Sequence, residues 1–470
     1  MIAPSARLAM PKAAWERGNP TQTTLFSVGL ALAAFFSPPI APRFSPGSIS
    51  LAPPETTADS GRAPGIFPLR VVAGQRYLVD ATGAPFLIHG DSPWSLIAQL
   101  TREQIDQYLE DRRLKGFNAI LVELIEHKFS SNAPNNIYGA APFLAPGDFS
   151  TPNEAYFAHA EYAVRKAAEK GILVMLAPMY LGYEGGDQGW YQQTLTNSVA
   201  VVEEYGRYLA TRFRNFENIL WVHGGDFAPP KLDKVRALAS AIRRVDDKWL
   251  HTFNGARSSS ALGLASSEGW VSLNNIYTTT DVAPAAAAEY SRSTMPFFLV
   301  EAIYENEGAD DLTVRRQAYQ AVLGGATGHL FGNRPIWLMG PGWQAALGSP
   351  ASTTLPHLRR LLEAHQWWTL VPDGRKLLSG GFGTAPAQTT VSLASDRRFA
   401  IGYTPAVRTL TFDLAKLVGP RVRVRWYDPT NGVYSEAVGS PFKASSVTVR
   451  PVGTNSRGLG DWALVLESIP

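Results

Sequence analysis

Eight short apolar segments recur along the middle of the chain, and each is followed by a helical or turn-rich stretch. Segments that are apolar on both faces are typical of parallel strands covered by helices. Eight such units predict a (β/α)8 TIM barrel, an α/β fold. A doubly wound sheet is disfavoured because no glycine-rich nucleotide-binding motif follows the first strand. The predicted strands start near residues 85, 117, 172, 218, 250, 270, 297 and 328.

Capping signals predict where two of the intervening helices begin. Thr101 and Gln104 have the spacing of a capping box, and so do Thr151 and Glu154. We therefore expect one helix to begin at each box. Further helices are expected near residues 198–214, 231–246 and 355–365.

A different pattern begins after about residue 373. Five segments alternate apolar and polar residues with a period of two, which is typical of strands with one buried face. Turn residues such as Asn431 and Gly432 separate them. This pattern predicts a small antiparallel β-sandwich over residues 373–470. The predicted strands are 389–393, 399–403, 421–427, 446–449 and 462–466.

The N-terminus has the pattern of an export signal. Arg7, Lys12 and Arg17 precede an apolar run at residues 25–36, and a stretch rich in proline and serine follows. The run is shorter than the ~20 residues of a transmembrane helix, so we expect no membrane span after signal removal. An ordinary N-terminus with a chance apolar patch is the alternative. We expect an exported protein, periplasmic or extracellular, with a leader over 1–42, a flexible linker over 43–64 and the catalytic barrel over 65–372.

Charge and cysteine content exclude several classes of function. Lys and Arg number 43 against 40 Asp and Glu, and the net charge of +3 argues against a nucleic-acid partner. The chain has no cysteine, so disulfides, thiolate metal sites and cysteine nucleophiles are excluded. We expect no cofactor, and the sequence leaves the oligomeric state open.

Two acidic residues at strand ends are the predicted catalytic pair. In a barrel of this kind the reacting groups lie at the C-terminal ends of the strands. Asp226 follows the fourth strand behind two glycines, and Glu301 ends the seventh strand after an apolar run. Hydrolysis of a glycosidic bond needs one carboxylic acid and one carboxylate flanking that bond. Glu305 and Glu123 are alternative candidates for a catalytic carboxylate. We expect Glu305 to be solvated or ion-paired and Glu123 to bind substrate.

The other strand ends carry amides, acids and aromatic rings. Amides and acids can hydrogen-bond to sugar hydroxyls, and flat rings can stack on sugar C–H faces. The expected substrate is therefore an oligosaccharide or a glycoside. The predicted substrate-binding residues are Asp91, Trp94, Glu123, His127, Tyr180, His223, Asn254, Asn275, Tyr277, Tyr304, Asn333 and Trp337.

A metal-dependent hydrolase is a weaker alternative. His89, His127 and His223 lie near strand ends and could form a three-histidine site with Asp91 or Asp226. No pair among these histidines has H-x-H or H-E-x-x-H spacing, so we expect hydrogen-bonding roles for them and no metal. A serine nucleophile is unsupported because no G-x-S-x-G motif occurs.

Four motifs follow one another along the predicted barrel in a specific order. They are Gly90-Asp91-Ser92-Pro93-Trp94, Leu100-Thr101-x-Glu103 with Gly116-Phe117-Asn118, Trp221-x-x-Gly224-Gly225-Asp226, and Pro296-x-x-x-Val300-Glu301-x-x-Tyr304-Glu305. Together they resemble the apiosidase-like glycoside hydrolases, glycoside hydrolase family 140. The later motifs Trp426-Tyr427-Asp428-Pro429 and Asp461-Trp462 resemble the β-sandwich, of a collagen-binding type, that ends many of those proteins.

The resemblance extends over about residues 65–470 and carries expectations about function. It implies retaining hydrolysis, with Asp226 as the acid/base and Glu301 as the nucleophile. Relatives suggest removal of apiose from plant pectin side chains, but the segment 123–129 departs from the family pattern, and such loops set sugar specificity. We expect a retaining hydrolase of a terminal, furanosidic linkage. A non-catalytic carbohydrate-binding or adhesion protein built on a decayed glycosidase barrel is the alternative.

Overall fold

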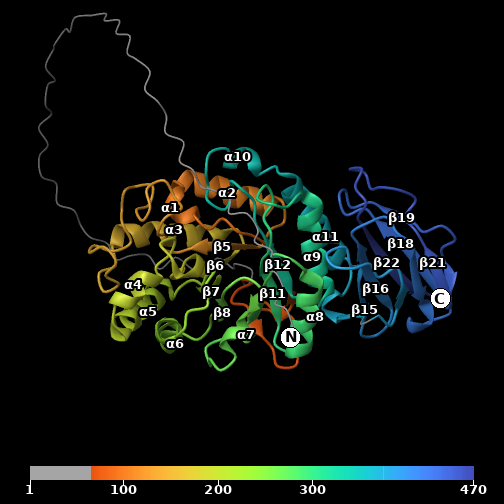
Figure 1. The fold of residues 1–470 in the computed structure, drawn as a ribbon, viewed down its shortest axis with the longest axis horizontal. Coiled ribbons are helices and arrows are strands. Elements are labelled where there is room, and N and C mark those ends of the chain that lie inside the picture. Colours follow the sequence, from red (N-terminus) through yellow and green to blue (C-terminus); the bar gives the residue numbers. More distant parts are fainter. Residues whose placement is uncertain (1–64, 374) are drawn as a thin grey trace, which may run out of the picture. The chain divides into compact units, whose positions relative to one another are not determined.

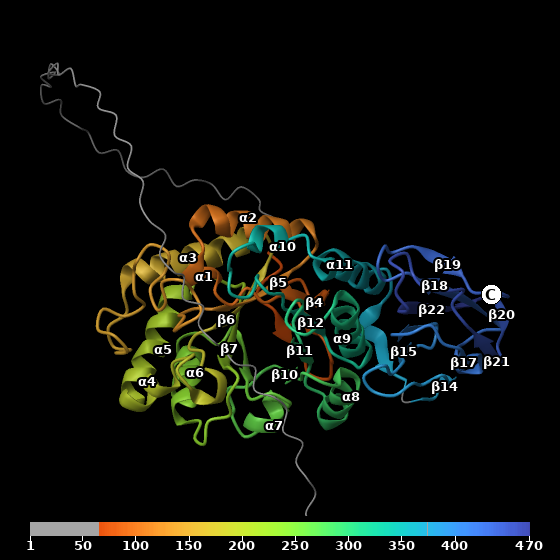
Figure 2. The ribbon, with the colours of Figure 1, turned by 45° about the horizontal axis from the view of Figure 1, so that its top comes forward.

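Eight parallel strands form a barrel in the computed structural model, which describes residues 65–373 and 375–470 (Figures 1 and 2). The strands are β4 (Ile88–Asp91), β5 (Ala119–Glu123), β6 (Leu173–Ala177), β7 (Ile219–Gly224), β8 (Leu250–Asn254), β10 (Asn274–Tyr277), β11 (Phe297–Glu301) and β12 (Gly328–Phe331). They pair in the order β8-β7-β6-β5-β4-β12-β11-β10. Where β8 meets β10, the N–H groups of Ser272 and Leu273 donate to the carbonyl oxygen of His251, which brings the two ends of the sheet together. The predicted barrel is confirmed.

Helices surround the ring of strands (Figure 2). The longer ones are α2 (Arg102–Leu114), α3 (Glu154–Glu169), α5 (Val199–Phe213), α6 (Asp233–Val245), α8 (Val282–Arg292), α9 (Asp311–Leu323) and α11 (Pro350–Glu363). The shorter ones are α1 (Leu96–Gln99), α4 (Tyr191–Thr196), α7 (Ala261–Ala265) and α10 (Trp343–Ala346). The capping box of Thr101 and Gln104 is present at the start of α2.

The second predicted capping box is wrong. Helix α3 begins after Asn153, whose side chain accepts a hydrogen bond from the N–H of Ala155 at 3.2 Å. The Thr151 hydroxyl instead accepts from the N–H of Ala145 at 3.1 Å. Asn is a stronger N-cap than Thr, so the helix starts two residues later than the box predicts.

The barrel interior is filled by side chains from alternate strand positions. Leu121, Met175, Val222 and Leu330 belong to one buried cluster inside the ring. A three-stranded antiparallel sheet precedes the barrel, and its apolar side chains join the same cluster. Because the core is packed, the open site must lie at the C-terminal ends of the strands. The small sheet comprises β1 (Arg70–Val71), β2 (Leu78–Val79) and β3 (Pro85–Phe86).

Two antiparallel sheets form the predicted C-terminal sandwich. The larger contains β13 (Leu370–Pro372), β15 (Thr390–Ala394), β16 (Phe399–Thr404), β22 (Trp462–Ile469), β18 (Arg421–Tyr427), β19 (Tyr434–Glu436) and β20 (Phe442–Lys443). The smaller contains β14 (Leu378–Gly380), β17 (Leu410–Asp413) and β21 (Ser446–Val449). The core between them includes Phe412, Val424 and Leu464. All five predicted strands are present, and the five that sequence reasoning missed have only two to four residues each.

The sandwich packs against helix α9 of the barrel through a buried ion pair. The Arg315 guanidinium donates to both carboxylate oxygens of Asp461, at 2.9 and 3.0 Å, and both side chains are fully buried. The Tyr403 hydroxyl also donates to Asp461, and its ring stacks on Tyr319 with centroids 4.4 Å apart. The sandwich is therefore joined to the barrel by a polar contact that water does not reach.

Two expectations concern residues for which the structure gives no description. The leader over 1–42 and the linker over 43–64 lie outside the described residues. Within the described part of the chain, no helix combines the length and apolar character required to cross a bilayer.

Candidate active site

A run of three residues with positive φ holds Asp226 at the end of β7. Gly224, Gly225 and Asp226 have φ of 89°, 121° and 48°. A Cβ on Gly225 would lie 2.1 Å from Cδ2 of Tyr180, and one on Gly224 would lie 2.3 Å from the carbonyl oxygen of Asn254. Only glycine fits both positions, because of the conformation and because of the close approach. The two glycines thus seat Asp226 against the Tyr180 ring.

A β-bulge turns Glu301 toward the barrel mouth. Val300 of β11 lies in the interior cluster, so the next residue of a regular strand would face outward. Ile276 of β10 pairs with Leu299. The next residue of β10, Tyr277, pairs with Glu301, so one residue of β11 is passed over. Because of the bulge, the side chain of Glu301 lies on the same side of the sheet as that of Tyr277, whose ring belongs to the interior cluster.

Asp226 and Glu301 act on each other electrostatically. Burial, and then the charge of Asp226, raises the pKa of Glu301 well above its usual range. Burial also raises the pKa of Asp226. Hydrogen bonding from Tyr277 lowers the pKa of both carboxyls against that trend. Ionisation of one carboxyl therefore disfavours ionisation of the other, as an acid and a nucleophile in one site require.

Each of the two carboxyls keeps one oxygen without a hydrogen-bond partner. The Tyr180 hydroxyl donates to Oδ2 of Asp226 at 3.0 Å, and Oδ1 has no partner. Hydrogen bonding from Tyr304 lowers the pKa of Glu301, while its Oε2 is unpaired. Oδ2 of Asp226 is thus held in place, and each carboxyl has one oxygen available to a ligand.

Tyr304 is fixed as a donor to Glu301 by its own neighbours. The indole Nε1 of Trp94 donates to the Tyr304 hydroxyl oxygen at 2.9 Å. The hydroxyl proton of Tyr304 is therefore available for Glu301. The ring lies flat on Gly332, where a Cβ would come within 2.4 Å of three ring atoms. Trp94 and Tyr304, both predicted at strand ends, thus orient the Glu301 carboxylate.

Two further polar side chains at the mouth have unpaired atoms. Glu123 ends β5 on the interior side, is 2% exposed, and its Oε2 has no partner. Burial, then the charges of Glu126 and Asp226, raises the pKa of Glu123 well above its usual range. Asn254 ends β8 fully buried, and neither amide atom has a partner. Buried polar groups are rarely left unpaired, so both are suited to contact a polar ligand.

Aromatic rings line the mouth beside β4, β5 and β6. Trp94 and Tyr180 have centroids 5.7 Å apart, and Phe129 lies 6.2 Å from Tyr180 and 5.1 Å from Trp337. The structure thus brings together three predicted residues. Phe129 was missed, although it lies only two residues after His127 in a segment that sequence analysis singled out as a specificity loop.

The carboxylate of Asp91 faces the helices and not the mouth. Its Oδ2 lies 2.7 Å from Nε of Arg112 on α2 and accepts from the Tyr108 hydroxyl at 2.6 Å. Its Oδ1 accepts from the N–H of Ser92 at 2.8 Å. Both oxygens are engaged and fully buried, so we propose that Asp91 stabilises the barrel wall and does not contact substrate.

The rival carboxylate Glu305 is tied to the start of helix α11. Its oxygens accept from the Ser349 hydroxyl at 2.6 Å and from the N–H of Ala351 at 2.8 Å. The amide of Asn333 donates to the same carboxylate. A carboxylate at a helix N-terminus is favourable there. Glu305 and Asn333 therefore anchor α11, although sequence analysis expected Asn333 to bind substrate.

The strand-end histidines do not gather. His223 faces outward and its Nε2 lies 2.9 Å from Nδ1 of His251, and burial lowers the pKa of His223 to about 3. His89 pairs in the same way with His329 at 3.0 Å. His127 contacts the carbonyl oxygen of Asp187 and the side chain of Gln193. Within residues 65–373 and 375–470, no three His, Asp or Glu side chains form a metal-binding group.

The side chain of Asn275 makes hydrogen bonds within the barrel wall. Its amide donates to the Thr252 hydroxyl at 2.9 Å and to the carbonyl oxygen of Phe253 at 3.0 Å. These bonds join β8 to β10, which share no regular ladder. Asn275 therefore closes the barrel where the backbone pairing is weakest.

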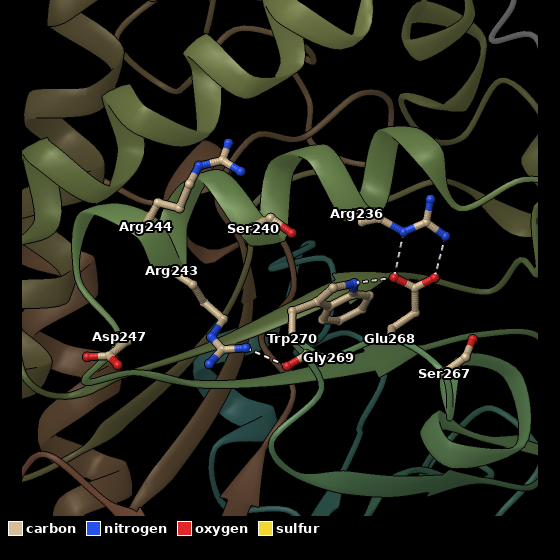
Figure 3. A pocket seen from close by; sticks show the side chains of 9 residues that line it. All are labelled: Arg236, Ser240, Arg243, Arg244, Asp247, Ser267, Glu268, Gly269 and Trp270. Atoms are coloured by element: carbon tan, nitrogen blue, oxygen red, sulfur yellow. Dashed lines mark hydrogen bonds and ion pairs between the residues drawn. The ribbon is translucent and has the colours of Figure 1, made fainter.

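A surface cavity lies between α6 and the segment that precedes β10 (Figure 3). The cavity runs along the outer face of α6, on the barrel wall, and its lining includes none of the strand-end residues described above. Its arginines are already engaged: Arg236 binds both carboxylate oxygens of Glu268, and Arg243 donates to the carbonyl oxygen of Gly269 (Figure 3). We therefore assign no ligand to it.

Two family models match the sequence, and together they span nearly all of the described residues. Residues 72–369 match the model described as "Apiosidase-like, catalytic domain". Residues 371–467 match the model described as "Putative collagen-binding domain of a collagenase". No curated protein matches the chain in sequence.

Solved structures of glycoside hydrolases share this fold. One described as a glycoside hydrolase has 23% identity and a TM-score of 0.73, with 85% of this chain and 96% of that chain covered. A family 5 glycoside hydrolase from Bacteroides vulgatus has 22% identity and a TM-score of 0.75, with 85% and 93% covered. At these identities the likeness concerns the fold.

Proposed function

The chain belongs to the family of apiosidase-like catalytic domains, and on that premise we propose that it is an exported, retaining glycoside hydrolase that cleaves a terminal furanosidic linkage. The observation that carries the proposal is the pair of half-buried carboxyls at the ends of β7 and β11, Asp226 and Glu301, each of which has one oxygen without a hydrogen-bond partner. Export rests on the leader pattern at residues 1–42. The furanosidic linkage rests on the family.

The proposed reaction is a double displacement at the anomeric carbon. Asp226 donates its proton to the glycosidic oxygen while Glu301 attacks the anomeric carbon, so the bond to the leaving alcohol breaks and a glycosyl ester of Glu301 forms. Asp226, now ionised, then removes a proton from water. That water attacks the anomeric carbon and releases Glu301 as the carboxylate.

The neighbours of each carboxyl support these roles. Glu301 is near two phenol donors, Tyr304 and Tyr277, which favour its ionised form. Asp226 has a close donor in Tyr180 and sits at the tip of a strained turn, so its free oxygen can approach a leaving group. The proposed reaction requires the proton of the pair to lie on Asp226 and the negative charge on Glu301 when substrate is bound.

The lining favours a sugar that carries no charge. Glu123 and Asn254 offer unpaired atoms to hydroxyl groups, and Trp94 and Phe129 offer ring surface. An anionic ring would lie near the negative charge that the Asp226–Glu301 pair carries, which repels it. We propose that the sugar bound next to Glu301 is neutral.

A screen of aryl glycosides and plant or bacterial oligosaccharides tests the proposal. Proton NMR of the first-formed product should show the anomeric configuration of the substrate. Asp226→Asn and Glu301→Gln should each lower kcat on the order of a thousandfold while the protein stays folded. An inverted first product, or near-wild-type turnover in either variant, would reject the mechanism. Binding of oligosaccharides in calorimetry without any hydrolysis would favour the adhesion alternative.

A further inference from the structure

A loop that sequence analysis did not single out brings an arginine to the catalytic pair. Arg257 follows β8 and precedes β9 (Ser259–Ser260), a two-residue strand. Strand β9 pairs antiparallel with β10, and Ser259 lies opposite Tyr277. This pairing fixes the loop beside the end of β10, where Tyr277 in turn lies beside Glu301.

The Arg257 side chain contacts two tyrosines. Its Nε donates to the Tyr277 hydroxyl oxygen at 3.1 Å. Its guanidinium carbon lies 5.2 Å from the ring centroid of Tyr183, in the loop after β6. A guanidinium that both donates to a hydroxyl and lies over an aromatic ring has a defined orientation. Arg257 therefore joins the loops after β6 and β8 to the Tyr277 hydroxyl.

The Tyr277 hydroxyl connects Arg257 to both carboxyls. It accepts from Arg257 at 3.1 Å, so its own proton can be donated elsewhere, and the strand register sets Tyr277 opposite Glu301. Hydrogen bonding from Tyr277 lowers the pKa of both carboxyls, in agreement with this placement. The charge of Arg257 also lowers the pKa of both groups. A cation at this place therefore stabilises the state in which one carboxyl is charged.

The other titratable groups that face the pair do not provide a positive charge. They are Glu123 at the end of β5, with Glu126 behind it, Tyr180 after β6, and Tyr304 after β11. Glu123 would add negative charge, and the tyrosines act as neutral donors. Burial alone would push the pair toward carrying two protons.

We propose that Arg257 is a positioning residue that acts through Tyr277 to keep one carboxyl of the Asp226–Glu301 pair ionised at neutral pH. The inference rests on the proposed function, because the ionised carboxyl is the nucleophile of that reaction. Without Arg257 the pair takes up its second proton at a higher pH. A doubly protonated pair has an acid but no nucleophile.

The pH profile of kcat/KM tests this role. In Arg257→Gln the acidic limb should move up by about one pH unit, while Arg257→Lys should stay near wild type, since it keeps the charge. Arg236→Gln, at the distant surface cavity, is the matched control and should not move the limb. An unshifted limb in Arg257→Gln would overturn the inference and leave the hydrolase assignment intact.

Thermal melts give a readout that needs no activity. A carboxyl whose pKa is higher in the folded than in the unfolded state stabilises the fold at low pH. Its contribution to the free energy of unfolding is lost as pH rises from the unfolded pKa to the folded pKa. Removing Arg257 raises that folded pKa further, so the Tm deficit of Arg257→Gln should grow between pH 5 and pH 8. In a background that carries both Asp226→Asn and Glu301→Gln the growth should vanish. A Tm deficit of Arg257→Gln that is the same at every pH would mean that Arg257 has a merely structural role. This result can be obtained without a substrate.

Discussion

Alanine at Gly225 should disable the site by moving Tyr180. The φ of 121° at Gly225 is a conformation that alanine adopts at a cost of about 1–3 kcal/mol. Its Cβ would also lie 2.1 Å from Cδ2 of Tyr180, where carbon atoms ordinarily sit ~3.5–4.0 Å apart. The ring must therefore shift by about 1.5 Å. That shift moves the hydroxyl that binds Asp226 at 3.0 Å.

A displacement of about 1 Å in a catalytic constellation costs on the order of a hundredfold in rate. We expect Gly225→Ala to lower kcat/KM by about that factor, measured on any cleaved aryl glycoside. Gly74→Ala is the control, because Gly74 has a φ of 81° and no atom lies within 4 Å of the position that the new methyl group would occupy. It should lose about 1–2 kcal/mol of stability and no activity. If Gly225→Ala kept kcat/KM within about threefold of wild type, the reasoning would be refuted.

Other predictions concern single contacts. Tyr304→Phe should lower kcat about 10–100-fold in steady-state kinetics, because it removes one hydrogen bond to charged Glu301. An unchanged kcat would mean that Tyr304 has no part in the mechanism. Asp91→Asn should cost about 3 kcal/mol in urea unfolding because the buried Arg112 would lose its fully buried carboxylate partner and keep only Asp111, which is 24% exposed. A loss under about 1 kcal/mol would contradict the ion-pair argument. Burial raises the pKa of Glu126 to about 7, so wild-type stability should fall as pH rises from about 4.5 to 7. Glu126→Gln should flatten that part of the Tm–pH curve, and an unchanged slope would mean that another group titrates.

The barrel could be predicted because its signal is repeated. Eight apolar runs alternate with helices, and only a closed parallel sheet accommodates eight of them easily. The positions of Asp226 and Glu301 follow from the same logic, because strand ends converge at one mouth wherever they occur in the chain. The second capping box failed because Asn153 competed with Thr151 for the same helix start.

The sequence could not predict whether a side chain at a strand end points into the barrel or toward the helices. In a strand that is apolar on both sides, nothing in the sequence distinguishes inward from outward positions. Asp91 and His223 are at strand ends but face the helices, whereas Glu123 faces inward. Glu301 reaches the mouth only because the bulge shifts its register. Arg257 was missed because its position depends on β9, a strand of two residues.

The most direct test of the catalytic pair is to trap the intermediate. In Asp226→Asn the base for the second step is absent, so an activated aryl glycoside with a good leaving group should load the enzyme and release sugar slowly. Mass spectrometry of the intact protein should show the added mass of one sugar residue, and peptide mapping should locate it on Glu301. An adduct on another residue, or hydrolysis with inversion and no adduct at all, would contradict the account.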